Sequence, residues 1–216
     1  MTKKRFVAIL LCVTLVALAA IGATFAYLTD TKTVDNTFTM GNVAIKLDET
    51  NVNDPTGDRV TSNAYNVYPG AVVTKDPIVH NTGKNAAYIR ATVNVSNWMN
   101  LCAAYYPESG FEFTKPGYEK SLELLVGTLG EGWSVVGVTR GDTFTIGQFD
   151  AKFILKYDGT LAAGADTTAM FQTVTIPAGL DNASAASFDE VKVVAQAIQA
   201  DGFDTWEAAF TAFDAK

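Results

Sequence analysis

The side chains that could perform chemistry are few. His80 is the only histidine of the chain, and its two cysteines are Cys12 and Cys102. Zinc sites are built from histidine, cysteine and carboxylate ligands, and the sequence has no H-E-x-x-H motif. A Ser-His-Asp site could use only His80, and no G-x-S-x-G motif presents a serine nucleophile. We therefore predict no catalytic residues, no metal ligands and no enzyme activity, and we expect His80 to be structural.

Residues 48–58 are rich in side chains that carry oxygen ligands. The candidates are Asp48, Glu49, Asn51, Asn53, Asp54 and Asp58. Such oxygens suit Ca²⁺ outside the cell, but their spacing does not match an EF-hand loop. We expect a solvated loop and no cofactor, with Ca²⁺ binding as the alternative.

The amino-acid composition limits the kinds of partner that we expect. The 216 residues include 16 basic and 23 acidic side chains, a formal net charge of −7. Since 48 % of the residues are hydrophobic and only 18 % are charged, most of the chain should fold. The acidic balance offers no basic stripe for phosphates, so we expect no nucleic-acid partner.

The first 26 residues have the pattern of a signal peptide. Lys3, Lys4 and Arg5 precede an apolar run that continues to about Gly22, and Ala23-Thr24-Phe25-Ala26 has small residues where a signal peptidase needs them. The alternative is a retained membrane anchor, because the apolar run is long enough to span a bilayer. We predict cleavage between Ala26 and Tyr27, contact with the membrane only as a precursor, and a location in the extracellular matrix or on the cell surface.

The elements that would follow are mainly strands. Apolar and polar residues alternate in 43–47, 87–96 and 191–197. We also expect strands in 121–126 and in 72–80, the latter interrupted by Pro77, which suits an edge or a bulge. Turn signals recur between these segments, which is typical of an all-β sandwich. We therefore predict a jelly-roll-like β-sandwich over residues 42–216. Cys102, the single cysteine left after cleavage, cannot form an intramolecular disulfide and is expected to be buried.

A short helix is expected at the end of the chain, over about residues 204–215. Asp204 and Glu207 have the spacing of a capping box, and Trp206, Ala209, Phe210 and Phe213 fall on one helical face. This face should pack on one end or edge of the sheets.

Several segments resemble the TasA/camelysin family of Gram-positive bacteria. The most specific is the junction 22–31, with Asn36-Thr37-Phe38-Thr39-Met40-Gly41-Asn42-Val43 after it. Tyr68-Pro69-Gly70, Asn81-Thr82-Gly83 and Ala87-Tyr88-Ile89-Arg90 are also similar to family members, whereas 97–165 matches only loosely. The resemblance implies export with a SipW-type signal peptidase and a jelly-roll domain that polymerises with itself into biofilm-matrix fibres, with an accessory matrix protein as a further expected partner.

The resemblance also implies that residues 27–41 act as a donor strand for the next subunit. Alternate positions of this segment, Val34, Asn36, Phe38 and Met40, would share one face of an extended strand. The alternative is that the segment forms the domain's own first strand or a loose tail.

Two other functions stay open. A surface adhesin or carbohydrate-binding module could use Trp98, Tyr105, Tyr106 and Phe111, although we expect these aromatic residues to be buried. A camelysin-type metallopeptidase ranks lowest, because the sequence lacks an evident set of zinc ligands.

Overall fold

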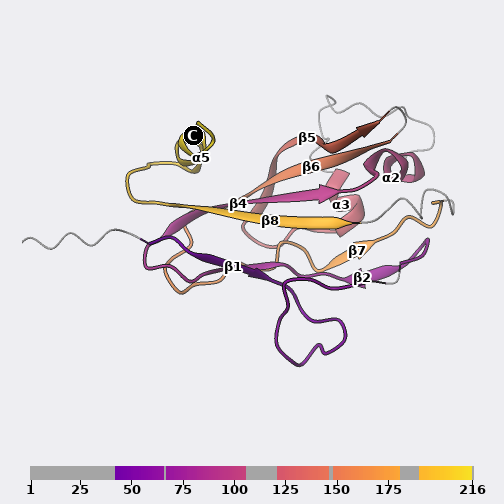
Figure 1. Cartoon of the computed structure of the whole chain (residues 1–216), viewed down its shortest axis with the longest axis horizontal. Coiled ribbons are helices and arrows are strands. Elements are labelled where there is room, and N and C mark those ends of the chain that lie inside the picture. The colour runs from indigo at the N-terminus through magenta and orange to yellow at the C-terminus, as the bar shows by residue number, and fades with distance from the viewer. Residues whose placement is uncertain (1–41, 66, 106–120, 146–147, 181–189, 216) are drawn as a thin grey trace, which may run out of the picture. The chain divides into compact units, whose positions relative to one another are not determined.

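The computed structural model describes residues 42–65, 67–105, 121–145, 148–180 and 190–215 (Figure 1). The expected cleavage site between Ala26 and Tyr27 and the expected donor residues Val34, Asn36, Phe38 and Met40 lie outside these ranges. Residues Gly41–Lys216 form one compact unit, separate from Met1–Met40. Within the described residues, no helix combines the length and the apolar character that crossing a membrane requires.

The larger sheet has four antiparallel strands in the order β5-β6-β4-β8. They are β5 (Trp133–Thr145), β6 (Gln148–Tyr157), β4 (Ala87–Val95) and β8 (Val191–Gln199). Strand β4 is central, and its alternate residues Ala87, Ile89, Ala91, Val93 and Val95 are completely inaccessible to solvent. The alternation that predicted strands at 87–96 and 191–197 is confirmed.

The facing layer is made of two short antiparallel pairs. Strand β1 (Ile45–Asp48) pairs with β3 (Ile78–Asn81), and β2 (Val72–Thr74) pairs with β7 (Thr173–Thr175). The strand expected over 72–80 is present as two strands on either side of the expected interruption at Pro77, and the two strands join different partners. Proline has no N–H for a sheet ladder, which fits this break. One core cluster joins the two layers, so the all-β sandwich is confirmed.

Two short helices, α2 and α3, lie between β4 and β5. Helix α2 (Trp98–Tyr105) follows β4, and the Trp98 ring meets Phe153 edge to face at 5.0 Å. Helix α3 (Ser121–Val126) occupies the segment predicted as a strand. The prediction was wrong because Leu122, Leu125 and Val126, which are all buried, follow helical rather than strand spacing.

The predicted C-terminal helix is present as α5 (Trp206–Asp214), with a different cap. Thr205, not Asp204, is the N-cap, and its hydroxyl accepts a hydrogen bond from the Ala208 N–H at 3.1 Å. Arg90 of β4 forms two 2.7 Å bonds to the Asp214 carboxylate. Helix α5 thus packs on the face of β4 and β8 that points away from the core.

Candidate functional site: an open sheet edge beside a groove

Strand β8 lies at one edge of the four-stranded sheet. All nine of its residues pair with β4, and no strand of the described part of the chain pairs with its other side. Edge strands in stable monomers are usually interrupted by prolines, bulges or charges, because a free ladder recruits other chains. Strand β8 contains no proline, its register is regular, and Lys192 is its single charged residue. It is therefore a long template for another strand.

The pairing register identifies the backbone groups that face outward. The Ser96 N–H donates to the Glu190 carbonyl, and the Ala200 N–H donates to the Ala86 carbonyl. Backbone bonds of an antiparallel pair alternate, so the even-numbered residues of β8 bond to β4. The N–H and C=O groups directed to the open side belong to Val191, Val193, Ala195, Ala197 and Gln199. The same reasoning applied to β1 directs the backbone groups of Ile45 and Leu47 away from β3.

The opposite edge of the sheet is built differently. Strand β5 has register shifts between Val135 and Gly137 and between Arg140 and Phe144. Such bulges twist a strand and interrupt its ladder, which protects an edge from pairing. The sheet therefore has one interrupted edge, at β5, and one regular edge, at β8.

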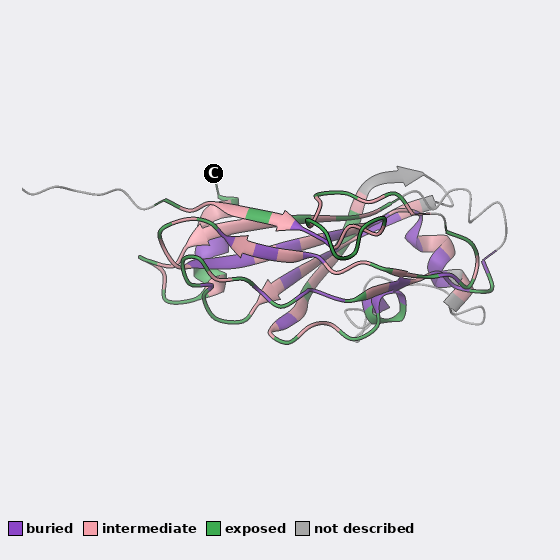
Figure 2. Ribbon diagram, turned by 90° about the horizontal axis from the view of Figure 1, so that it is seen from below, coloured by how far each residue is buried: buried purple, intermediate pink, exposed green. Residues whose placement is uncertain are grey.

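The core-facing side chains near β8 are incompletely covered. Val191, Val193, Ala195 and Ala197 pack against the core but are only half-buried, whereas every core-facing residue of β4 is inaccessible. Ile45 and Leu47 of β1 are half-buried in the same way. Figure 2 shows this pattern as buried segments inside the layers and intermediate ones along their margins. The sandwich is thus less tightly closed on the side of β1 and β8.

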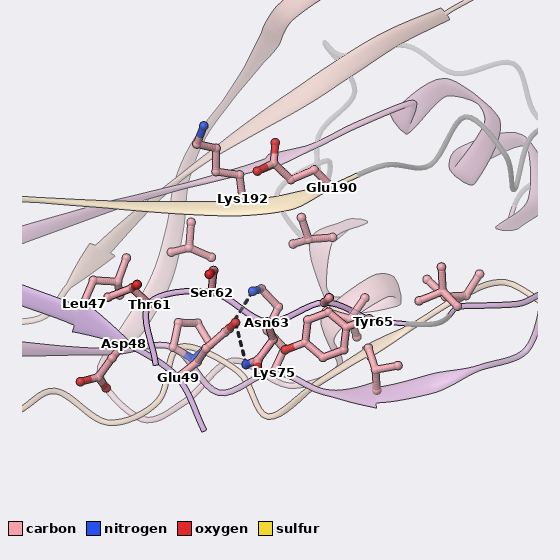
Figure 3. Close-up of a pocket in the computed structure, with 18 residues that line it drawn as sticks. Leu47, Asp48, Glu49, Thr61, Ser62, Asn63, Tyr65, Lys75, Glu190 and Lys192 are labelled. Atoms are coloured by element: carbon pink, nitrogen blue, oxygen red, sulfur yellow. Dashed lines mark hydrogen bonds and ion pairs between the residues drawn. The ribbon is translucent and has the colours of Figure 1, made fainter. Parts of the chain in front are cut away.

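A groove of about 520 Å³ lies on this open side. Strand β8 borders it with Val191, Lys192 and Val193, residues 61–65 and 67 lie opposite, and strands β1, β2 and β7 contribute further side chains (Figure 3). Its apolar lining consists of Leu47, Val67, Val73, Val174, Ile176, Val191 and Val193, together with Ala64 and Pro77. The other half of the lining is polar or charged. A groove with apolar positions from several strands beside a free ladder can receive an extended chain with apolar side chains at alternate positions.

An ion pair occupies the middle of this groove. The Lys75 Nζ lies 2.7 Å from the Glu49 Oε2, and the Asn63 Nδ2 donates to the Glu49 Oε1 at 3.0 Å. The Tyr65 ring lies 5.7 Å from the Lys75 Nζ. Burial and the negative charge of Glu49 raise the pKa of Tyr65 to about 12, so its hydroxyl stays protonated.

A second charged cluster lies beside the groove and connects β1, β3 and the loop after β1. Asp48 lies 2.6 Å from the Arg59 Nε and 3.0 Å from the His80 Nε2, while the His80 Nδ1 lies 2.7 Å from Asp166. Arg59 also contacts Asp76 at 2.9 Å. These partners are 11 to 86 residues apart in sequence, so sequence reasoning missed the cluster.

The protonation of this cluster follows from its contacts. Burial raises the pKa of Asp48, but hydrogen bonds from Lys46, His80 and Arg59 outweigh it and bring the pKa to about 2. Burial lowers the pKa of His80, and the carboxylates of Asp48 and Asp166 reverse this effect and raise it above 6.5. His80 therefore joins two carboxylates that favour its charged form.

The acidic segment 48–58 is only partly the solvated loop that we expected. Asp48 and Glu49 are 3 % and 5 % exposed, because both belong to the ion-pair clusters. Asn53, Asp54 and Asp58 are exposed, as expected for a solvated loop. The expectation was wrong for the first two residues, since their partners Arg59 and Lys75 both lie outside the segment.

A zinc-site interpretation does not fit these donor groups. Both ring nitrogens of His80 face carboxylates, and the Asp48 carboxylate is already shared by Lys46 and Arg59. Across the described ranges, no group of three or more histidine, cysteine or acidic residues could hold a metal ion. Catalytic zinc needs three protein ligands with an open position, so we derive no catalytic step from this cluster.

The remaining candidates are Cys102 and the aromatic residues that an adhesin could use, and they lie either in the core or outside the described residues. Cys102 is 1 % exposed, which confirms the expected burial. Trp98 is inaccessible and therefore cannot contact a ligand on the surface. Tyr106 and Phe111 and the side chain of Tyr105 lie outside the description.

Comparison with known proteins adds one match. Residues 1–98 match the family model described as camelysin metallo-endopeptidase. No curated protein and no solved structure matches the chain. The match includes β1, β2, β3, β4 and the segment 61–67, whereas β8 and β7 lie beyond it.

Proposed function

We propose that this chain, which belongs to the TasA/camelysin family through residues 1–98, is a secreted structural subunit of extracellular biofilm-matrix fibres. Its subunits would polymerise head to tail, with residues 27–41 of one copy pairing as a donor strand with β8 of the next. The observation that carries this proposal is the regular edge of β8, unpaired on one side within the described residues, beside a groove lined by both apolar and polar side chains.

The chemistry of the donor segment matches such an acceptor. An extended strand would pair with the outward backbone groups of β8, and Val34, Phe38 and Met40 would enter the groove. Fifteen extended residues span about 50 Å, more than the nine residues of β8 require. The remaining length can reach from one subunit to its neighbour.

Head-to-tail growth follows from the separation of donor and acceptor. The donor segment and the β8 groove are different surfaces of the same chain, so each exchange leaves one of each unused. Contacts of this kind are heterologous, and they generate filaments unless the rotation closes a ring. The interrupted edge of β5 limits competing sheet-to-sheet pairing.

Export prepares the donor segment in this scheme. A SipW-type signal peptidase would cleave between Ala26 and Tyr27, and the new N-terminus would begin the donor segment. Before cleavage the apolar run would hold the precursor at the membrane. The mass of the exported protein tests this step, and a mature chain that starts far from Tyr27 would contradict it.

Electron microscopy of the purified mature chain 27–216 tests the fibre role. We expect filaments from this chain and none from a chain that lacks residues 27–40. Monodisperse particles from both chains, across pH and Ca²⁺ concentration, would contradict self-assembly and favour a monomeric adhesin. Such a result would also leave assembly with an accessory matrix protein to be examined.

A substitution in β8 tests the acceptor edge directly. The Ala195 N–H points to the open side, so Ala195→Pro removes a donor-strand bond while keeping the ladder to β4. We expect Ala195→Pro to fold but to lose filaments, whereas the matched control Ala195→Ser should keep them. Filaments of normal yield from a folded Ala195→Pro chain would show that β8 is not the acceptor.

A metallo-endopeptidase is the second candidate, and the description of the matching family model favours it. The ligand geometry described above does not support it. Casein cleavage that persists through repurification, is abolished by a chelator and returns with zinc would establish this activity. A preparation without such cleavage would leave the structural role.

A further inference from the structure

The polar part of the groove lining brings an amine, an amide and a carboxylate together. The Glu49 Oε2 lies 2.7 Å from the Lys75 Nζ, and the Glu49 Oε1 accepts a hydrogen bond from the Asn63 Nδ2 at 3.0 Å. Figure 3 shows both contacts meeting at Glu49. The amine of a lysine and the side-chain amide of an asparagine are therefore held beside the same acid.

The backbone holds the Asn63 amide in one orientation. Its Oδ1 accepts a hydrogen bond from the Val52 N–H at 3.0 Å, and its Nδ2 also donates to the Thr50 carbonyl at 2.8 Å. Because a backbone N–H only donates and a backbone carbonyl only accepts, these two bonds distinguish the amide oxygen from the amide nitrogen. The nitrogen is therefore the atom that faces Glu49, and the oxygen faces a backbone donor.

The surrounding structure keeps most water away from these three side chains. The side chains of Glu49 and Lys75 are only 7 % and 12 % exposed, and Asn63 is half-buried. The Tyr65 ring lies 5.7 Å from the Lys75 Nζ. Exclusion of water strengthens the electrostatic effects of fixed groups on a reaction and protects reacting groups from hydrolysis.

We propose that Lys75 and Asn63 form an intramolecular isopeptide bond, with Glu49 as the group that transfers the protons. The inference is independent of the proposed function, because the bond lies within one subunit. The site contains a nucleophilic amine, a carbonyl carbon, an acid in contact with both nitrogens and a backbone N–H at the carbonyl oxygen. Holding reacting groups in place can correspond to an effective concentration of about 10⁵–10⁸ M, which an unreactive amide requires.

The reaction needs no added reactant. The Glu49 Oε2 takes one proton from the Lys75 ammonium, and the resulting amine nitrogen attacks the Asn63 Cγ to form a carbon–nitrogen bond. The Val52 N–H stabilises the negative charge that develops on the Asn63 Oδ1. Glu49 then gives its proton to the Asn63 Nδ2 and takes the second proton from the attacking nitrogen. The bond between Cγ and Nδ2 breaks, the carbonyl re-forms, and ammonia leaves with the proton from Glu49 as ammonium, so that nothing is oxidised or reduced.

The bond closes a covalent ring over residues 63–75, which contains β2 and part of the groove wall. Cys102 is the single cysteine of the described residues, so no disulfide constrains this part of the chain. A bond between Lys75 and Asn63 limits the freedom of the unfolded chain as a disulfide does, and reducing agents do not break it. The ring therefore keeps the segment around Asn63 attached to the end of β2.

Mass spectrometry of tryptic peptides tests this bond in protein purified after expression of the full chain. Trypsin cleaves after lysine and arginine, and Lys75 is the single such residue between Arg59 and Lys84. We expect a peptide 60–84 that is not cleaved after Lys75 and is lighter by the mass of one ammonia molecule. Lys46, whose ion pair with Asp48 involves no amide among the described contacts, should be cleaved normally.

Two variants separate the roles of the acid and the amine. Glu49→Gln keeps the shape of the side chain but cannot transfer protons, so the rate of ammonia loss should fall about 100-fold or more. Lys75→Arg keeps a positive charge beside Glu49 without the nucleophile and should keep the full mass. The control Glu190→Gln, at another acid of the groove lining, should react as the wild type does.

The wild-type peptide decides the inference even where a variant fails to fold. A peptide of full mass that is cleaved after Lys75, in protein incubated in its folded state, would show an ion pair without a bond and overturn the inference. Loss of water instead of ammonia would place the bond at Glu49 and also overturn it. Unchanged ammonia loss in Glu49→Gln would contradict the role of Glu49. Filament formation is a separate measurement, so either proposal can fail without the other.

Discussion

Asp48→Asn is the substitution whose energetic effect follows most directly from the structure. The Asp48 side chain is 2 % exposed and contacts Lys46, Arg59 and His80. These contacts lower its pKa from 3.8 to about 2. A depression of this size corresponds to about 2.5 kcal/mol of folding free energy at neutral pH. Asparagine keeps the shape and one oxygen acceptor but removes the charge, so we expect the variant to be less stable by about that amount.

The structure also predicts how the stability difference between the two proteins changes with pH. A carboxyl with a depressed pKa stabilises the fold above its unfolded pKa, and this contribution is lost as pH falls through the folded pKa. The stability difference between wild type and Asp48→Asn should therefore be complete above about pH 5 and fall to about half near pH 3. Urea unfolding at a series of pH values measures this difference.

A control variant in the same loop and a refuting result can both be defined for this experiment. Asp58→Asn changes an exposed carboxylate of the same loop and should alter stability by less than about 0.5 kcal/mol. A difference below about 1 kcal/mol for Asp48→Asn at pH 7, or one that does not vary between pH 3 and pH 6, would refute the argument that this charge is held by its partners.

The remaining predictions concern the charge of His80 and the close packing of Gly130 against the Ala169 backbone. The raised pKa of His80 means that its charge stabilises the fold fully below about pH 6.5 and progressively less as pH rises through the folded pKa. The loss of stability caused by His80→Gln, measured by urea unfolding, should therefore become smaller above that pH. A loss that becomes larger would contradict the contact with two carboxylates. A Cβ on Gly130 would overlap the Ala169 carbonyl oxygen, so Gly130→Ala should lower the melting temperature. Gly137→Ala, whose Cβ would meet Ile154 at 3.6 Å, should change it much less, and equal effects of the two substitutions would count against steric exclusion.

Local patterns in the sequence were sufficient for the regular parts of the fold. The alternation in 87–96 predicted β4 because a strand buried on one face needs apolar residues at every second position. The spacing of Trp206, Phe210 and Phe213 predicted α5 for the corresponding reason in a helix. Segment 121–126 was misassigned because two turns of helix are too short to separate the two periods by pattern alone.

The candidate site could be predicted only in part. The sequence directed attention to Val34, Asn36, Phe38 and Met40 as one face of a strand, but it contained no sign of the surface that would receive them. Strand β8 reads as an ordinary half-buried strand, and its position at a free edge depends on which strands become its neighbours. Strand order is a property of long-range pairing, which no local pattern encodes.

Composition and local spacing by themselves determined the scarcity of catalytic groups, the signal-like N-terminus, the strand-rich character and the final helix. Only the tertiary structure brought Glu49 to Lys75 and joined His80 to Asp48 and Asp166, because these partners are separated by 26, 32 and 86 residues. The tertiary structure also decided that β5 is an interrupted edge and β8 a regular one. The physical reason is that burial and pairing depend on contacts between distant segments, whereas periodicity reports only what each segment can offer.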